Sequence, residues 1–251
     1  MHAAAMPPSP LHLVEEVATA RNTEELHLAI QRAASRLGFD TYCFGMFYNE
    51  PGSGEPQYFS IDNYRSSWVE HYTQSRYQEV DIAVTHCAGH TTPLVWTRKL
   101  YEAPHLKPLE EEGLAQGLDG GVTLPVHSPW LIGMGGLIMA SAEHADRVAE
   151  RAADFVATGQ LLACHVAQAV RNLDLLPASM AFRPSEELTP REAECLQWAA
   201  TGLPAQVIAK RMGISVATVN SFFLPSIRRK LGAASTIEAV SLAFRHRLIR
   251  L

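Results

Sequence analysis

The chain has 251 residues and a net charge of −5, with 47% hydrophobic and 19% charged residues, a composition typical of a globular protein of one or two domains. No apolar run approaches the roughly 20 residues that a membrane span requires, which argues against a transmembrane segment and a membrane partner. The four cysteines are widely spaced and form no Cys-x-x-Cys pair, which argues against a disulfide framework or a zinc ribbon and favours the reducing cytoplasm.

The first two-thirds of the chain alternates between helical and strand patterns. An Ala/Pro-rich lead-in, Met1–Pro10, is expected to be disordered. Helical patterns cover 11–37 in two pieces, 66–76, 108–116 and, as one long helix, 143–173. Strand patterns cover 41–48, 57–61, 94–96, 121–126 and 136–140, with turn residues at 50–54. This order predicts an α+β fold for residues 11–174, an N-terminal α/β/α sandwich built on a mostly antiparallel sheet.

The C-terminal part of the chain differs in pattern and in charge. Residues 175–187 contain two prolines and no periodicity, which predicts a linker. Residues 188–251 carry nine Lys/Arg against three Asp/Glu, a net charge of +6, whereas the rest of the chain carries −11. A basic helical domain joined to an acidic body suggests that only this domain meets phosphate. A charge fluctuation in a short helical domain would give the same numbers, so charge alone leaves both interpretations open.

Start and stop signals divide residues 188–251 into four helices. The segment Thr189–Glu192 has the form of a capping box, with proline at the first helical position. Gly202 and Gly213 supply left-handed stops after the first and second helices. Ser215 can cap a third helix by accepting from the backbone N–H of Thr218. Two helices joined by the tight turn at Gly213 predict a helix-turn-helix within a four-helix domain.

The third of these helices has a polar beginning and a basic end. Polar side chains at its front can read base edges of DNA, while the basic end can hold phosphates. The predicted DNA-binding residues are Ser215, Thr218, Asn220, Ser221, Arg228, Arg229 and Lys230.

The motifs of this domain closely resemble the DNA-binding domain of LuxR-type regulators. They read LTPRE, ATGLPAQVIAKRMGIS, TVN, IRRKLG and EAVSLAFRHRLI. The resemblance implies double-stranded DNA as a partner. Two departures fall in the third helix, where one residue is extra before Ile227 and Pro225 lies inside the helix. Proline costs about 3 kcal/mol inside a regular helix, and one extra residue rotates the remainder of the helix by about 100°. Either the helix absorbs both changes or the reading surface is altered.

The same family places a sensor for N-acyl-homoserine lactones ahead of the DNA-binding domain. The spacing Tyr64-x3-Trp68-x3-Tyr72-x8-Asp81 fits the pocket of that sensor, as do Trp96 and Gly121. The resemblance therefore implies a ligand site in the N-terminal domain. Taken singly, Trp68, Trp96 and Tyr72 are more typical of plain core, and Asp81 is more typical of a helix cap or a surface acid. Their joint spacing favours the ligand site.

The chemistry of these side chains suits a small amide. The indole N–H of Trp68 can donate to a lactone carbonyl, and the hydroxyl of Tyr64 can donate to an amide carbonyl. Ionised Asp81 has only acceptors, so it can take the amide N–H, and Trp96 can pack on the ring or the acyl chain. Ile138 lies near where some relatives place a hydroxyl facing the ligand amide. The predicted ligand-binding residues are Tyr64, Trp68, Tyr72, Asp81, Trp96, Gly121 and Ile138.

Other chemistry finds little support in the sequence. It contains no phosphate-binding loop, dinucleotide fingerprint or nucleophile elbow, which predicts a protein that is not an enzyme and has no cofactor. The His86-Cys87-x2-His90 group lacks a standard zinc spacing, so no metal is expected. We expect a ligand-responsive transcriptional regulator that binds DNA as a homodimer, with the long helix 143–173 as its seam. The alternatives are a regulator with another small-molecule ligand and an interaction module with impaired DNA binding.

Overall fold

The computed structural model describes residues 10–49, 56–127, 134–177, 185–246 and 248–249. Their contacts separate them into two compact units, one containing the described residues up to Pro177 and the other those from Ser185 onward. The predicted lead-in up to Ser9, the turn at 50–54 and linker residues 178–184 lie outside the described residues.

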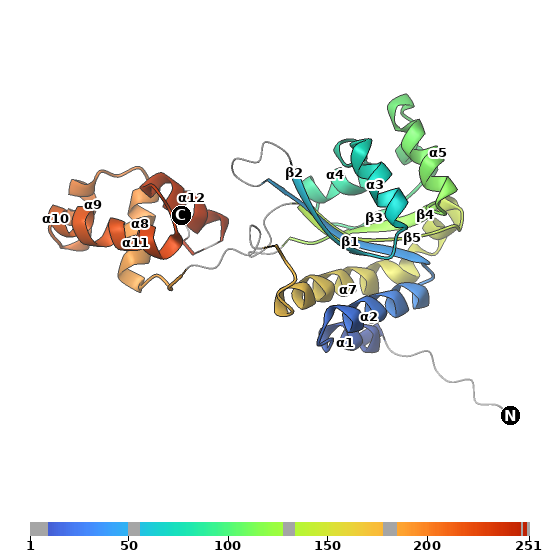
Figure 1. Ribbon diagram of the computed structural model, residues 1–251, viewed down its shortest axis with the longest axis horizontal. Coiled ribbons are helices and arrows are strands. Elements are labelled where there is room, and N and C mark those ends of the chain that lie inside the picture. Colours follow the sequence, from blue (N-terminus) through green and yellow to red (C-terminus); the bar gives the residue numbers. More distant parts are fainter. Residues whose placement is uncertain (1–9, 50–55, 128–133, 178–184, 247, 250–251) are drawn as a thin grey trace. The chain divides into compact units, whose positions relative to one another are not determined.

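The first unit is built on one five-stranded sheet in which every neighbouring pair of strands is antiparallel (Figure 1). The strand order is β2-β1-β5-β4-β3. The strands are β1 Thr41–Asn49, β2 Pro56–Asp62, β3 Leu94–Val95, β4 Gly120–Pro125 and β5 Met134–Ser141. The predicted antiparallel sheet is therefore confirmed, strand by strand within one or two residues at most ends.

Helices cover both faces of this sheet, as the predicted α/β/α sandwich requires (Figure 1). The helices on one face are α1 Pro10–Ala18, α2 Thr23–Arg36 and α7 Ala152–Asn172. Those on the other face are α3 Ser66–Gln74, α4 Ile82–Gly89 and α5 Lys107–Ala115. Side chains alternate between the faces of a strand, so on β4 Leu124 packs toward Gly159 of α7 while Gly121 packs toward Trp96 on the other side. Short 3₁₀ helices at Tyr77–Glu79, Arg98–Tyr101 and Pro104–Leu106 connect the elements of the second face.

The single helix predicted for 143–173 is wrong, because the structure divides it into α6 Ala145–Glu150 and α7. Arg151 stands at the break, with φ −98° and ψ 16°. Its guanidinium donates to the carbonyls of Leu37 at 2.8 Å and Gly38 at 3.0 Å, and lies 5.3 Å from the centre of the Phe155 ring. The two hydrogen bonds reach across 114 and 113 residues of sequence, so hydrophobic periodicity does not record them.

The second unit is the predicted four-helix domain. Its helices are α8 Pro190–Ala200, α9 Ala205–Met212, a third helix made of α10 Val216–Thr218, a π-helical turn Val219–Phe223 and α11 Leu224–Leu231, and α12 Thr236–Arg245. The capping box joins Thr189 and Glu192 in both directions, and Gly202 and Gly213 have φ values of 78° and 67°. The axes of α9 and Val216–Leu231 differ in direction by 110°, an angle typical of a helix-turn-helix.

No single helix within the described ranges is long and apolar enough to cross a membrane. The bent pair formed by α9 and Val216–Leu231 passes that test on length and composition alone.

Candidate functional site

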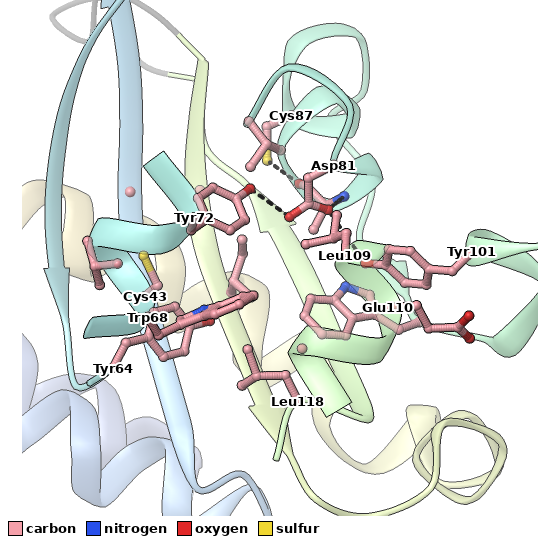
Figure 2. A pocket seen from close by; sticks show the side chains of 18 of the residues that line it. Cys43, Tyr64, Trp68, Tyr72, Asp81, Cys87, Tyr101, Leu109, Glu110 and Leu118 are labelled. Atoms are coloured by element: carbon pink, nitrogen blue, oxygen red, sulfur yellow. Dashed lines mark hydrogen bonds between the residues drawn. The ribbon is translucent and has the colours of Figure 1, made fainter. Parts of the chain in front are cut away.

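A cavity lies between the sheet and the helices α3, α4 and α5 of the first unit (Figure 2). Its empty volume is about 1160 Å³, including the space at its open mouth. Aromatic and aliphatic side chains form most of its wall, which is typical of sites for small molecules. Six of the seven predicted ligand-binding residues line it, namely Tyr64, Trp68, Tyr72, Asp81, Trp96 and Ile138.

Helix α3 provides the aromatic wall. Trp68 and Tyr72 are four residues apart and therefore share one face of the helix, where their rings meet edge to face with centres 5.8 Å apart. Tyr64 comes just before the helix and reaches the same cavity (Figure 2). Burial, together with the nearby charge of Asp81, raises the pKa of Tyr72 well above its ordinary value. This hydroxyl therefore stays protonated and can act as a hydrogen-bond donor.

Asp81 is the acidic group of the cavity and also the N-cap of α4. Its Oδ1 accepts from the backbone N–H of Ala83 at 2.8 Å, which satisfies one free donor at the start of the helix. Its Oδ2 accepts from the hydroxyl of Tyr72 at 2.8 Å, and Oδ1 also accepts from Tyr101 at 3.5 Å (Figure 2). The residue is 8% exposed. Burial raises the pKa of Asp81, and these three hydrogen bonds oppose that rise.

Trp96 forms the opposite wall, and strand β4 holds it in place. Its backbone N–H donates to the carbonyl of Gly121 at 2.8 Å, and its indole Nε1 donates to Thr123 Oγ1 at 3.0 Å. Gly121 does not line the cavity. It lies behind Trp96, where a Cβ atom would stand 2.8 Å from Cε3 of the indole. Ile138 of β5 pairs with Thr123 and adds an aliphatic floor.

Gly121→Ala is expected to lower the melting temperature of the full chain and to weaken ligand binding. The new methyl group would stand 2.8 Å from both the Trp96 ring and the backbone oxygen of Met139, and overpacking of this kind costs about 1–3 kcal/mol. Gly89→Ala is the matched control, since a Cβ at Gly89 meets nothing within 4 Å. Thermal unfolding with and without ligand measures both effects. Equal behaviour of the two variants would contradict the role given to Gly121.

Some cavity residues escaped the sequence analysis. Tyr101 reaches Asp81 from a short 3₁₀ helix, and no periodicity in the sequence marks that approach. Cys43 and Tyr58 lie on neighbouring strands with their Sγ and hydroxyl oxygen 3.3 Å apart. Thr123 does not line the cavity but holds Trp96 from behind; it is fully buried, and its lone hydroxyl within the apolar run of β4 is the sequence signal for it.

The π-helical turn resolves the two departures in the third helix of the second unit. The backbone N–H of Leu224 donates to the carbonyl of Val219, five residues back, so this turn holds one residue more than an α-helical turn. The extra residue is thereby absorbed. Pro225 then follows directly after the π-helical turn, at the second position of α11, and the helix continues through it.

The front of this helix is polar and exposed. Ser215 caps it by accepting from the backbone N–H of Thr218 at 3.0 Å, as its sequence position predicts. The two hydroxyl oxygens of this pair lie 2.7 Å apart. Asn220 and Ser221 are exposed, and Phe222 follows them. Hydroxyl and amide side chains of this kind are the ones that hydrogen-bond to base edges in a DNA major groove.

Of the three basic residues predicted to hold phosphates at the end of this helix, the structure contradicts the role of Lys230 alone. Lys230 is only 8% exposed, and its ammonium lies 2.8 Å from Oε2 of Glu192 and 3.0 Å from the carbonyl of Glu187. The ammonium therefore holds α11 to α8 and is not free to meet phosphate. Arg229 is exposed and forms a two-pronged ion pair with Glu186, and Arg228 is half-buried.

A cavity of this kind and a helix-turn-helix on one chain define a ligand-sensing transcriptional regulator rather than an enzyme. Residues 22–170 match the family model of the autoinducer binding domain, and residues 186–243 match that of bacterial regulatory proteins of the luxR family. The chain therefore belongs to the LuxR family of quorum-sensing transcriptional regulators.

Named relatives agree with this assignment over most of their length. The transcriptional activator protein AnoR of Acinetobacter nosocomialis is 29% identical over 90% of this chain and 93% of its own. The quorum-sensing regulator RhlR of Pseudomonas aeruginosa is 26% identical over 92% of each chain. The crystal structure of Escherichia coli SdiA shares the fold, with a TM-score of 0.77 and 24% identity over 96% of this chain and 98% of SdiA. A structure of SdiA in complex with octanoyl-rac-glycerol has a TM-score of 0.75 and is 21% identical, over 98% of this chain and 100% of that SdiA chain.

Proposed function

We propose that the cavity binds an N-acyl-homoserine lactone and that the ligand-bound protein, a cytoplasmic homodimer, binds a palindromic DNA site. The observation that carries the proposal is the buried carboxylate of Asp81. An ionised carboxylate has about four acceptor positions, and three donors of the chain reach this one. A ligand amide N–H supplies a fourth donor and so lowers the cost of burying the charge.

The remaining lining suits the other parts of such a ligand. Trp68 and Tyr64 offer an indole N–H and a hydroxyl, the donors that a lactone carbonyl and an amide carbonyl need. The apolar lining, which includes Leu109, Leu114 and Leu118, suits an acyl chain. A ligand that fills this largely apolar cavity buries further apolar surface. A ligand that binds only the folded state stabilises it, so we expect ligand binding and folding of the first unit to be coupled.

The reason to propose a homodimer is the geometry of DNA rather than an exposed apolar face on α7, the predicted dimer seam. The apolar stripe of α7 is mostly used within the protomer, where Phe155, Leu162 and Val166 are buried, while Leu161 is 39% exposed. A helix-turn-helix dimer places two recognition helices about one turn of DNA apart and so reads a palindrome. Light scattering on the ligand-bound protein tests this part of the proposal.

Two alternatives change one part of this proposal each, the first the binding of DNA and the second the identity of the ligand. An interaction module with impaired DNA binding rests on Pro225 and the extra residue. The third helix continues through both by way of the π-helical turn, which supports DNA binding over this alternative. A different acyl ligand is suggested by the SdiA complex with octanoyl-rac-glycerol. That molecule has an acyl chain but no amide, so it has no amide N–H to donate to the carboxylate of Asp81.

Mass spectrometry of small molecules that co-purify with the protein is expected to find an acyl-homoserine lactone when the producing cells make one. The same protein, mixed with lactones from butanoyl to dodecanoyl, is expected to gain affinity for duplexes selected from a random-sequence library. The affinity should fall steeply with salt, because phosphate contacts release counterions. DNA binding that is absent with every lactone would leave the interaction module as the better account, and selective stabilisation by acyl-glycerols would replace the lactone.

A further inference from the structure

One large apolar side chain stands on the surface of the third helix of the second unit. Phe222 is 63% exposed, next to the exposed polar residues Asn220 and Ser221. The adjacent residue, Phe223, packs against the core of the unit, and the two rings meet edge to face with centres 5.5 Å apart. At this turn Phe223 packs against the core, whereas the side chain of Phe222 remains exposed to solvent.

The π-helical turn explains why this position faces outward. In a regular α-helix, Val219 and Ile227 are eight positions apart and would point about 80° away from each other. Seven positions bring two side chains to within about 20°. A turn that holds one extra residue lets eight positions cover the angle of seven. Both side chains are in fact fully buried in the same core. The added length is thus taken up on the exposed side, within Val219–Phe223.

We propose that Phe222 is a specificity-determining residue that contacts the 5-methyl group of a thymine in the DNA major groove. Thymine is the base that presents an apolar group there, and phenylalanine is among the side chains that pack on it. The neighbouring Asn220 and Ser221 supply polar groups for base edges, so Phe222 adds an apolar reading element to a polar surface. The inference rests on DNA binding by this helix and names the group that it recognises.

The experiment starts from duplexes that the lactone-bound, full-length protein selects from a random-sequence library. Each thymine of the selected half-site is then replaced in turn by deoxyuridine, which removes only the methyl group. Burying one methyl group is worth about 0.8 kcal/mol, so the wild-type affinity is expected to fall about fourfold at one position of the half-site. Phe222→Ala is expected to bind the thymine duplex about as weakly as the wild type binds the deoxyuridine duplex, and to lose all sensitivity to the replacement at that position.

The control is Leu28→Ala, which truncates an exposed apolar side chain of the first unit and should keep the full thymine preference. Circular dichroism checks that Phe222→Ala keeps its helix content. Phe222→Leu, which retains an apolar tip, should keep part of the sensitivity. An unchanged deoxyuridine effect in Phe222→Ala, or no effect at any position in the wild type, overturns the role of Phe222 alone. A wild type that selects no duplex overturns the DNA-binding proposal as well, which keeps the two failures distinct.

Discussion

Asp81→Asn is expected to weaken the binding of N-acyl-homoserine lactones by roughly 10- to 100-fold. A hydrogen bond to a charged group contributes about 1.5–3 kcal/mol, and each 1.4 kcal/mol is a factor of ten in affinity. The neutral amide offers one acceptor oxygen where the carboxylate offers two, and three donors of the chain already converge on this group. The ligand-induced rise in melting temperature of the full chain, measured over a concentration series, reports the change in affinity.

The choice of asparagine separates ligand binding from folding. Asp81 also caps α4, and asparagine caps helices about as well as aspartate, so the ligand-free variant keeps the cap and loses only the acceptor that faces the Tyr72 hydroxyl. Asp81→Ala loses the cap as well and should cost about 1 kcal/mol more. Asp154→Asn makes the same chemical change on the exposed surface of α7 and should leave ligand affinity unaltered. Wild-type affinity in Asp81→Asn would remove the basis for the lactone proposal.

Lys230→Met is expected to destabilise the second unit by about 3–5 kcal/mol, the cost of removing one partner from a buried ion pair. The change leaves the carboxylate of Glu192 buried with the hydroxyl of Ser226 at 2.6 Å but without a counter-charge. Hydrogen–deuterium exchange of α8 and α11 peptides in the full chain measures this, because exchange from buried helices reports the opening free energy. Both helices should lose protection.

The same pair predicts a dependence on pH. Burial raises the pKa of Glu192, but hydrogen bonds from Lys230, Ser226 and Thr189 outweigh it and lower that pKa from 4.5 to about 2. Glu192 therefore stabilises the folded unit above pH 4.5, and this contribution is lost as the pH falls toward 2. The difference in protection between wild type and Lys230→Met should shrink over that interval.

The control for this pair is Arg191→Met, which breaks the exposed ion pair of Arg191 with Glu194 and should cost no more than about 0.5 kcal/mol. The double variant Glu192→Gln/Lys230→Met removes both charges, keeps a side chain that can close the capping box at Thr189, and should regain much of the stability. Protection in Lys230→Met equal to that in Arg191→Met would show that the buried pair contributes little.

Local signals predicted most of the fold. The aromatic run of β1, the capping box at Thr189 and the stops at Gly202 and Gly213 depend on neighbours within a few residues, and each is found where the sequence indicates it. Two features could not be predicted in this way. The break at Arg151 depends on carbonyls more than 110 residues away. Helix α4 has only eight residues and no clear amphipathic period, so no pattern marked it.

The cavity was predicted because the spacing of Tyr64, Trp68, Tyr72 and Asp81 resembles the pocket of the LuxR-type sensor domain, and these four side chains line one cavity in the structure. The role of Lys230 was not predicted. A basic residue at the end of a recognition helix gives the same sequence pattern whether it contacts a phosphate or a buried carboxylate. Its partner Glu192 stands 38 residues away and was assigned only to the capping box. Tyr101 was missed for the same reason, because its contact with Asp81 is tertiary.

The ion pair between Arg229 and Glu186 has a consequence for affinity. Both terminal nitrogens of the Arg229 guanidinium donate to the carboxylate of Glu186 in the protein without DNA. The carboxylate therefore occupies the position that a DNA phosphate would take. In the DNA complex proposed above, a phosphate that contacts Arg229 would compete with Glu186 for the guanidinium. Arg229 would then contribute only the difference between its two anionic partners, which lowers the affinity of the domain for DNA of any sequence.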